Sequence, residues 1–76
     1  MLTPARGAQI EELGRRLREG LAAADEVRRE LHRLIVEEAE ANPDASFQEI
    51  ADRAGYERPR VSQLVAEARQ RDATEG

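Results

Sequence analysis

The chain of 76 residues has no cysteine, no tryptophan and no lysine. Without cysteine it can form neither a disulfide framework nor a thiolate metal site, which fits a reducing compartment. A single histidine, His32, excludes a site built from several histidines. No apolar run approaches the ~20 residues of a membrane-spanning helix, and the N-terminus does not resemble a secretory signal. We therefore expect a soluble cytoplasmic protein that binds no metal and no other cofactor.

Aromatic side chains are almost as rare, since only Phe47 and Tyr56 are present. Small domains usually depend on aromatic residues or on a partner subunit for core volume. Here the volume must come from leucine, isoleucine, valine and alanine, a composition typical of helices. All twelve basic residues are arginine, which with the many alanines indicates a GC-rich bacterial or phage genome. The sequence predicts an all-α protein, and its length allows one domain at most.

The net charge of −4 is unevenly distributed along the chain. Residues 1–45 carry seven arginines against ten acidic residues, whereas residues 57–71 carry four arginines against two. The acidic excess therefore belongs to the N-terminal part, and the C-terminal segment is locally basic. An acidic protein is expected to bind nucleic acid weakly when binding is non-specific, but a nucleic-acid partner is not excluded.

The N-terminal half has the spacing of a long amphipathic helix. Thr3-Pro4 is a favourable helix start, and Asn42 before Pro43 marks the end. Between them apolar residues recur every three or four positions. We predict one helix over residues 4–41, with a break at Gly20 as the alternative. At ~1.5 Å per residue it would span about 55 Å, too long for a monomer of this size to cover.

This length leads us to predict a homodimer through the N-terminal segment, residues 1–42. The residues predicted to form its seam follow a heptad pattern: Ile10, Leu13, Leu17, Leu21, Ala24, Val27, Leu31 and Leu34. The opposite faces are charged, and the acidic residues Glu37, Glu38 and Glu40 are expected on a solvated face. We expect His32 at the surface or at the seam.

Residues 43–71 have the spacing of a helix-turn-helix, and residues 72–76 are expected to fray. Ser46 and Glu49 match the capping box at the start of a first helix. Gly55 can take the positive φ that ends it, and a second helix is predicted over residues 59–71. Ala51 is expected to be small because the second helix crosses over it, and Ile50, Val61 and Leu64 are expected to form the wedge that fixes the angle. Ala54 and Tyr56 are expected to close the turn against the core.

The segments Ile50-Ala51-Asp52-Arg53-Ala54-Gly55-Tyr56 and Val61-Ser62-Gln63-Leu64 resemble a known motif. They are similar to the helix-turn-helix of bacterial transcription regulators of the lac-repressor and GntR types, which often read "IA..AG" and then "TVS..L". The resemblance covers residues 47–66, and residues 1–45 match neither family. One position departs from the pattern, because Glu57 or Arg58 stands where those families usually cap the second helix with serine or threonine.

The resemblance implies that the second helix lies in the major groove of DNA. It implies base contacts from Arg58, Pro59, Ser62 and Gln63. Arg58 would pair with guanine and Gln63 with adenine. It further implies phosphate contacts from Ser46, Arg53, Arg60 and Arg69.

Together these patterns predict a sequence-specific double-stranded DNA-binding protein, a small bacterial or phage transcription regulator. No membrane partner and no small-molecule effector are expected. The alternative is a helical protein-protein interaction module, such as an antitoxin-like or anti-sigma-like adaptor. That alternative is favoured if Arg58, Arg60 and Gln63 form salt bridges with Glu57, Asp52 or Glu67 of the same chain. An enzyme is not expected, because the sequence contains no nucleophile–base pair and no phosphate-binding loop.

Overall fold

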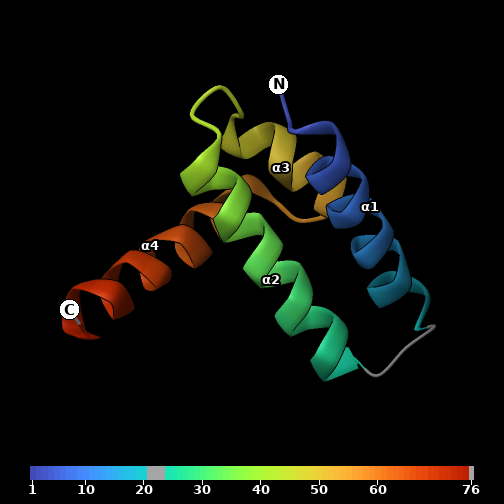
Figure 1. Cartoon of the computed structure of the whole chain (residues 1–76). Coiled ribbons are helices and arrows are strands. Elements are labelled where there is room, and N and C mark those ends of the chain that lie inside the picture. Colours follow the sequence, from blue (N-terminus) through green and yellow to red (C-terminus); the bar gives the residue numbers. More distant parts are fainter. Residues whose placement is uncertain (21–23, 76) are drawn as a thin grey trace.

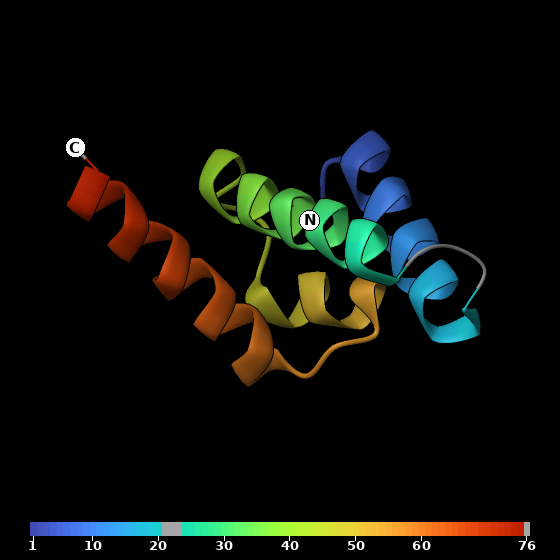
Figure 2. The same cartoon turned by 90° about the horizontal axis from the view of Figure 1, so that it is seen from below.

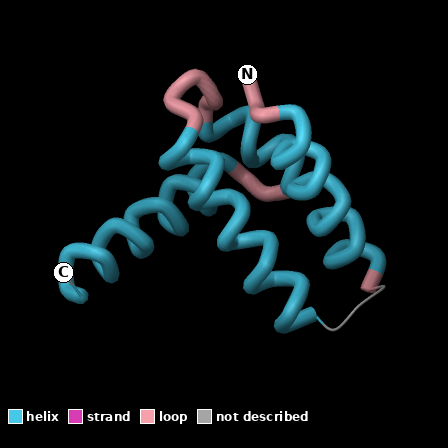
Figure 3. Tube along the Cα trace, viewed as in Figure 1, coloured by secondary structure: helices cyan, strands magenta, loops and turns pink. Residues whose placement is uncertain are grey.

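The computed structural model describes residues 1–20 and 24–75, with side chains up to residue 73. These residues form four helices, which are α1 (Pro4–Glu19), α2 (Ala24–Ala41), α3 (Phe47–Ala54) and α4 (Arg58–Glu75). The described part of the chain contains no strand (Figure 3). The predicted all-α class is therefore confirmed. None of the helices within the described ranges is both long and apolar enough to cross a membrane.

The four helices form a short bundle from which one helix projects. α1 and α2 lie side by side, and α1 packs on α2 and α3 (Figures 1 and 2). α4 packs on α2 and α3 as well, and in both views it lies on the side away from α1. The buried residues of α4 are Val61, Leu64 and Val65, all in its first half. Its C-terminal half therefore extends beyond the bundle.

The N-terminal segment is a hairpin of two helices, so the prediction of one continuous helix is wrong. α1 ends at Glu19, and Gly20 takes a left-handed conformation with φ 68°. Its amide donates to the carbonyl of Arg16, which closes the helix in the way that glycine often does. α2 then packs back against α1. The hairpin covers the apolar stripes of both helices within one chain, which a continuous helix could not do.

The apolar residues of the predicted seam therefore line the core of a single chain. Ile10 and Leu31 are fully buried, and Val27 and Leu34 are nearly so. Leu13 and Leu17 are partly buried against the same core. Ala24 is exposed, and Leu21 lies outside the described residues. A seam between two chains requires an unbroken helix; the homodimer itself stays a prediction.

Small residues let α1 and α3 approach closely. Gly14 is buried where α1 crosses the end of α3. A Cβ atom at this position would stand 2.4 Å from the carbonyl oxygen of Ala54. Ala51 and Ala54 are themselves buried on the α3 side. The closeness of the two helices therefore depends on the missing side chain at Gly14.

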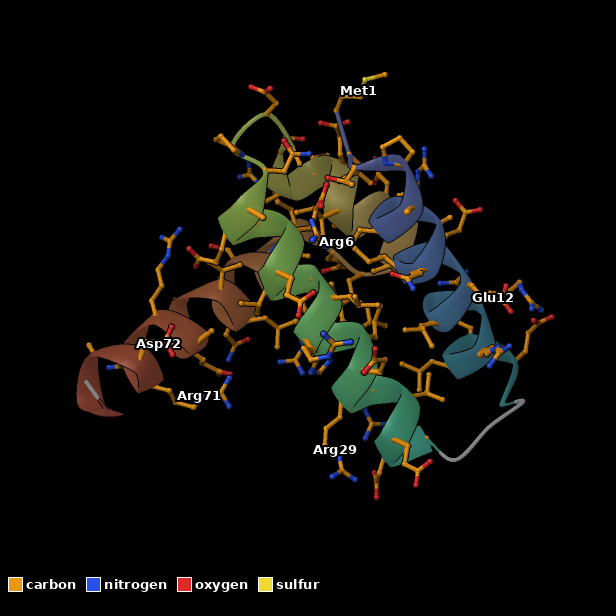
Figure 4. All side chains as sticks on the ribbon, viewed as in Figure 1. Met1, Arg6, Glu12, Arg29, Arg71 and Asp72 are labelled. Carbon is orange, nitrogen blue, oxygen red and sulfur yellow. The ribbon has the colours of Figure 1, made fainter. Side chains whose placement is uncertain are left out.

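Glu38 is the one charged residue buried in the described core, which contradicts the predicted solvated face. Its carboxylate accepts hydrogen bonds from the Thr3 amide at 2.6 Å, Arg6 Nη1 at 2.8 Å and Asn42 Nδ2 at 2.9 Å. Figure 4 shows Arg6 leaving α1 on the side that faces α2. Thr3 does precede α1, as predicted, but its side chain makes no cap hydrogen bond. Glu38 thus ties the start of α1 to the end of α2.

α4 is longer than the sequence predicts. It begins at Arg58, one residue before the expected start, and continues to Glu75 instead of ending at residue 71. Residues 72–75 are therefore helical where fraying was expected, and Gly76 lies outside the description. Nothing in the composition of residues 72–75 stops a helix, because the nearest proline is Pro59.

Candidate nucleic-acid interface

The first helix of the predicted motif, α3, begins at the expected capping box. Ser46 Oγ accepts from the Glu49 amide at 3.1 Å, and Glu49 Oε1 accepts from the Ser46 amide at 3.1 Å. Both groups of the predicted box are therefore present, and this prediction is confirmed. The cap fixes where α3 starts, so it also fixes the direction in which the free amides of its first turn point.

The turn between α3 and α4 depends on Gly55, whose φ is 77°. The amides of Gly55 and Tyr56 both donate to the carbonyl of Ala51 at 2.9 Å. From α1, Arg18 Nη1 donates to the carbonyl of Ala54 at 3.0 Å and lies over Gly55. The predicted turn residue is correct, and a guanidinium group from another helix stabilises the last carbonyl of α3.

The angle between α3 and α4 is held by buried apolar side chains. Ile50 and Val61 are fully buried and Leu64 is 7% exposed, as the predicted wedge requires. α4 starts without a serine or threonine cap: the backbone carbonyl of Glu57 accepts from the amides of Arg60 and Val61. α3, the turn and α4 thus form one packed unit with a defined geometry.

The predicted base-reading residues are exposed at the start of α4. Arg58, Pro59 and Ser62 line a shallow hollow together with Ser46, Phe47 and Gln48 at the start of α3. The structure thereby brings three of the four predicted base readers next to the predicted phosphate contact Ser46. Gln63 follows Ser62 in the sequence and does not line this hollow. Its side-chain amide donates to Glu67 Oε1 at 3.3 Å.

The predicted phosphate contacts are less concentrated. Arg53 forms an ion pair with Glu11 of α1 at 3.4 Å, and Arg69 forms one with Glu40 of α2 at 3.1 Å. Neither lines the hollow at the start of α3 and α4. Arg60 is exposed in the first turn of α4. In the part of the chain that the structure describes, neither Arg58 nor Arg60 has a carboxylate at ion-pair distance.

One group of polar residues near the turn was not predicted. His32 of α2 and Tyr56 of the turn share a hydrogen bond of 2.9 Å between Nε2 and the hydroxyl oxygen. Burial lowers the pKa of His32, and the positive charges of Arg60 and Arg28 lower it further. Burial also raises the pKa of Tyr56, against the opposing influence of the same two arginines. Only the helical spacing of Arg28 and His32, four residues apart, hints at this cluster in the sequence.

No family model, curated protein or solved structure matches this chain. Among the described residues there is also no group of three or more side chains arranged to hold a metal ion. The geometry at the start of α3 and α4 is therefore the basis for a functional proposal.

Proposed function

We propose that the chain binds double-stranded DNA in a sequence-specific way and acts as a small transcription regulator. The observation that carries this proposal is the exposed start of α4, where Arg58, Pro59 and Ser62 stand beside the start of α3. The major groove of B-DNA admits an α-helix. In a helix-turn-helix protein, the N-terminal residues of the second helix reach the base edges there.

Three physical features support a role in reading bases. The wedge of Ile50, Val61 and Leu64 fixes the angle at which α4 would enter the groove. The candidates Arg58, Pro59 and Ser62 are exposed at the start of α4, whose C-terminal half projects from the bundle (Figure 2). The Arg58 guanidinium, without an ion-pair partner in the described chain, is available for two parallel hydrogen bonds to guanine.

The start of α3 would then address the DNA backbone. The free amides of a helix's first turn and the positive end of its dipole favour an anionic ligand. Ser46 already caps Glu49, so the adjacent amides of Phe47 and Gln48 are the groups that would face a phosphate. Because the net charge is −4, few arginines are available for phosphate contacts. Affinity should therefore be modest and strongly dependent on salt.

We further propose that the DNA-bound form is a homodimer. A single chain offers too few phosphate contacts for tight binding, whereas two chains double them and read two half-sites. The contact between the chains would have to use a surface other than the buried part of the predicted seam.

The alternative, a protein-interaction module, predicts that the polar residues of α4 form hydrogen bonds or ion pairs within the chain. Gln63 does bond Glu67, which is the one contact in its favour. In the described structure, Arg58 and Arg60 form no ion pair with Glu57, Asp52 or Glu67. DNA remains the partner that the available arginines fit better.

Selection of duplexes from a random pool, followed by fluorescence anisotropy, tests the proposal. The protein should enrich a defined motif at ~50 mM salt. Arg58→Ala should reduce discrimination at one base pair by about 5- to 150-fold, since a bidentate arginine–guanine pair contributes ~1–3 kcal/mol. Arg16→Ala is the matched control, because Arg16 is an exposed arginine on α1 whose partner Glu12 is also held by Arg15.

The control variant should retain both the affinity and the base preference of the wild type. The proposal is wrong if no motif is enriched at this salt concentration. It is also wrong if Arg58→Ala keeps the wild-type base preference.

A further inference from the structure

The two arginines at the start of α4 point to different flanks of the helix. At about 100° per residue, Arg58 and Arg60 lie about 160° apart around the axis. The buried residues Val61, Leu64 and Val65 occupy the face toward the bundle. Arg58 lies on the flank next to α3, where it lines the hollow with Ser46. Arg60 therefore lies on the other flank, which is the side of α2.

On that flank, four groups from three elements gather. Arg60 comes from α4, Tyr56 from the turn, and Arg28 and His32 from α2. His32 and Tyr56 are joined by their hydrogen bond and stack edge to face, with ring centroids 5.7 Å apart at 72°. The charges of both Arg60 and Arg28 influence the pKa of His32 and of Tyr56. The two guanidinium groups are thus near the same pair of rings.

The charged groups around this cluster carry both signs, with a small excess of arginines. Of the groups on α2, Arg28 has one exposed partner, Asp25 at 3.3 Å, and Arg33 is paired with Glu30 and Glu37. The negative charge of Glu67 on α4 raises the pKa of His32. The charged groups that line the space between α2 and α4 beside His32 are Arg29, Arg33, Glu37, Glu67 and Arg71. Figure 4 shows Arg71 pointing from α4 toward the open side that faces α2.

The chemistry of these groups fits a phosphate diester. A guanidinium group binds phosphate oxygens through two parallel hydrogen bonds, and the Tyr56 hydroxyl can donate a third when it accepts from His32 Nε2–H. Arg28 can exchange Asp25 for a phosphate at little cost, because an ion pair at the surface contributes little to stability. The backbones of a duplex run along both sides of a helix that lies in the major groove. A cluster on the α2 flank of α4 therefore faces one of them.

We infer that Arg28, Tyr56 and Arg60, with His32 positioning the tyrosine, form a phosphate-binding site for the DNA backbone on the α2 flank of α4. This inference rests on the proposed function. It places one strand at the α3 flank, near Ser46, and the other strand at the cluster. It also adds α2 to the DNA-binding surface, although the resemblance implied contacts from the helix-turn-helix alone.

The test compares Arg28→Gln and Arg60→Gln with the charge-matched control Arg16→Gln, using the selected duplex and the intact protein. Loss of one phosphate contact should weaken binding by about eightfold at ~0.1 M salt and reduce the slope of log K against log salt by about 1. The loss should be the same for selected and random duplexes, because a phosphate contact carries no base information. Tyr56→Phe, which keeps the ring, should weaken binding less.

Position on the DNA gives a second readout. Neutral methylphosphonate linkages placed one at a time should reveal a phosphate whose neutralisation weakens wild-type binding but not binding by Arg28→Gln. The single histidine gives a third readout. A nearby phosphate favours the imidazolium, so the pKa of His32, followed by the NMR signal of its ring, should rise when duplex is added.

The outcomes separate the two proposals. If Arg58→Ala loses base discrimination while Arg28→Gln and Arg60→Gln behave like Arg16→Gln, the phosphate site is wrong and the proposed function stands. An unchanged pKa of His32 in a saturated complex also overturns the site. If the wild type enriches no motif and no variant differs from it, both proposals fail together.

Discussion

The buried carboxylate of Glu38 holds the start of α1 against the end of α2. Burial alone would raise its pKa, but the hydrogen bonds from Thr3, Arg6 and Asn42 outweigh this effect and lower the pKa from 4.5 to about 2. Because the pKa in the folded state is the lower one, the unfolded chain binds more protons between these values. The stabilisation is therefore complete above pH 4.5 and is lost as the pH falls toward 2.

We predict that Glu38→Gln lowers the free energy of unfolding by about 3 kcal/mol at pH 7. The variant loses the charged acceptor and leaves Arg6 without its closest partner. The difference from the wild type should shrink as the pH is lowered from 4.5 toward 2, where the wild-type carboxylate is itself protonated. Urea denaturation followed by circular dichroism at several pH values measures both effects.

Glu37→Gln is the neighbouring control for this prediction. The Glu37 side chain is 42% exposed, pairs with Arg33 and has only a longer contact of 3.8 Å with Arg6. Its loss should lower the free energy of unfolding by less than ~1 kcal/mol. Equal effects of the two substitutions, or a pH-independent effect of Glu38→Gln, would contradict the role assigned to the buried carboxylate.

At the scale of residues, the sequence predicts some contacts and misses others for a clear reason. Glu38 follows Leu31, Leu34 and Ile35 by seven, four and three positions, so helical spacing places it on the buried stripe. Its partner Arg6 is 32 positions away, and no local pattern predicts that pairing. The same holds for His32 and Tyr56, which are 24 positions apart. The cap of α3, by contrast, is formed within four residues and was predictable.

At the scale of elements, the crossing of α1 and α3 depends on Gly14. A Cβ atom there would lie 2.4 Å from the carbonyl oxygen and 2.9 Å from the carbonyl carbon of Ala54. Both atoms belong to the backbone of α3, so the helices would have to separate. Overpacking of this kind costs ~1–3 kcal/mol, which exceeds the ~1 kcal/mol that alanine gains over glycine within a helix.

We therefore predict that Gly14→Ala lowers the free energy of unfolding by about 1–2 kcal/mol, although alanine is the better helix former. Gly7→Ala is the matched control on the same helix. Its Cβ atom would lie 3.3 Å from Leu2 Cβ, and its nearest neighbours are side-chain atoms of Leu2 and Arg53 where those of Gly14 are backbone. That variant should be close to neutral in urea denaturation. A stabilised Gly14→Ala would show that α1 and α3 do not pack as closely as described.

Helix boundaries that carry a local sequence signal were predictable. Pro4, the capping box at Ser46 and the glycine at position 55 all stand at the boundaries that the sequence predicts. The end at Gly20 was recognised only as an alternative. Helix propensity cannot distinguish a break at Gly20 from a continuous helix, because the apolar stripe continues on both sides of the glycine. The packing of α2 on α1 determines the break instead, and this packing depends on residues far apart in the sequence.

At the scale of the molecule, the two predicted segments 1–42 and 43–71 share one core. Its members come from all four helices, including Ile10, Leu31, Ile50 and Val61. The N-terminal hairpin therefore supports the α3–α4 unit directly, and Arg18 reaches from α1 to the last carbonyl of α3. Because the hairpin folds back, the longest dimension is 36 Å, shorter than the ~55 Å that a continuous helix would span.

The left-handed conformation of Gly20 favours the hairpin over the continuous helix. Gly20 has φ 68°, and no neighbouring atom lies within 4 Å of a Cβ built there. Gly20→Ala therefore tests the cost of the left-handed backbone conformation without adding a steric clash. It should lower the free energy of unfolding of the monomer by ~1 kcal/mol, because an alanine in the left-handed region is strained.

Alanine also favours continuation of the helix through this position, which would uncover the core and let two chains exchange their N-terminal helices. Sedimentation equilibrium should therefore detect more dimer for Gly20→Ala than for the wild type. Gly20→Asn is the control, because asparagine tolerates the left-handed conformation, and it should stay close to the wild type. Identical stability and assembly of all three proteins would mean that packing of α2 on α1 alone selects the hairpin, with no contribution from the conformation of Gly20.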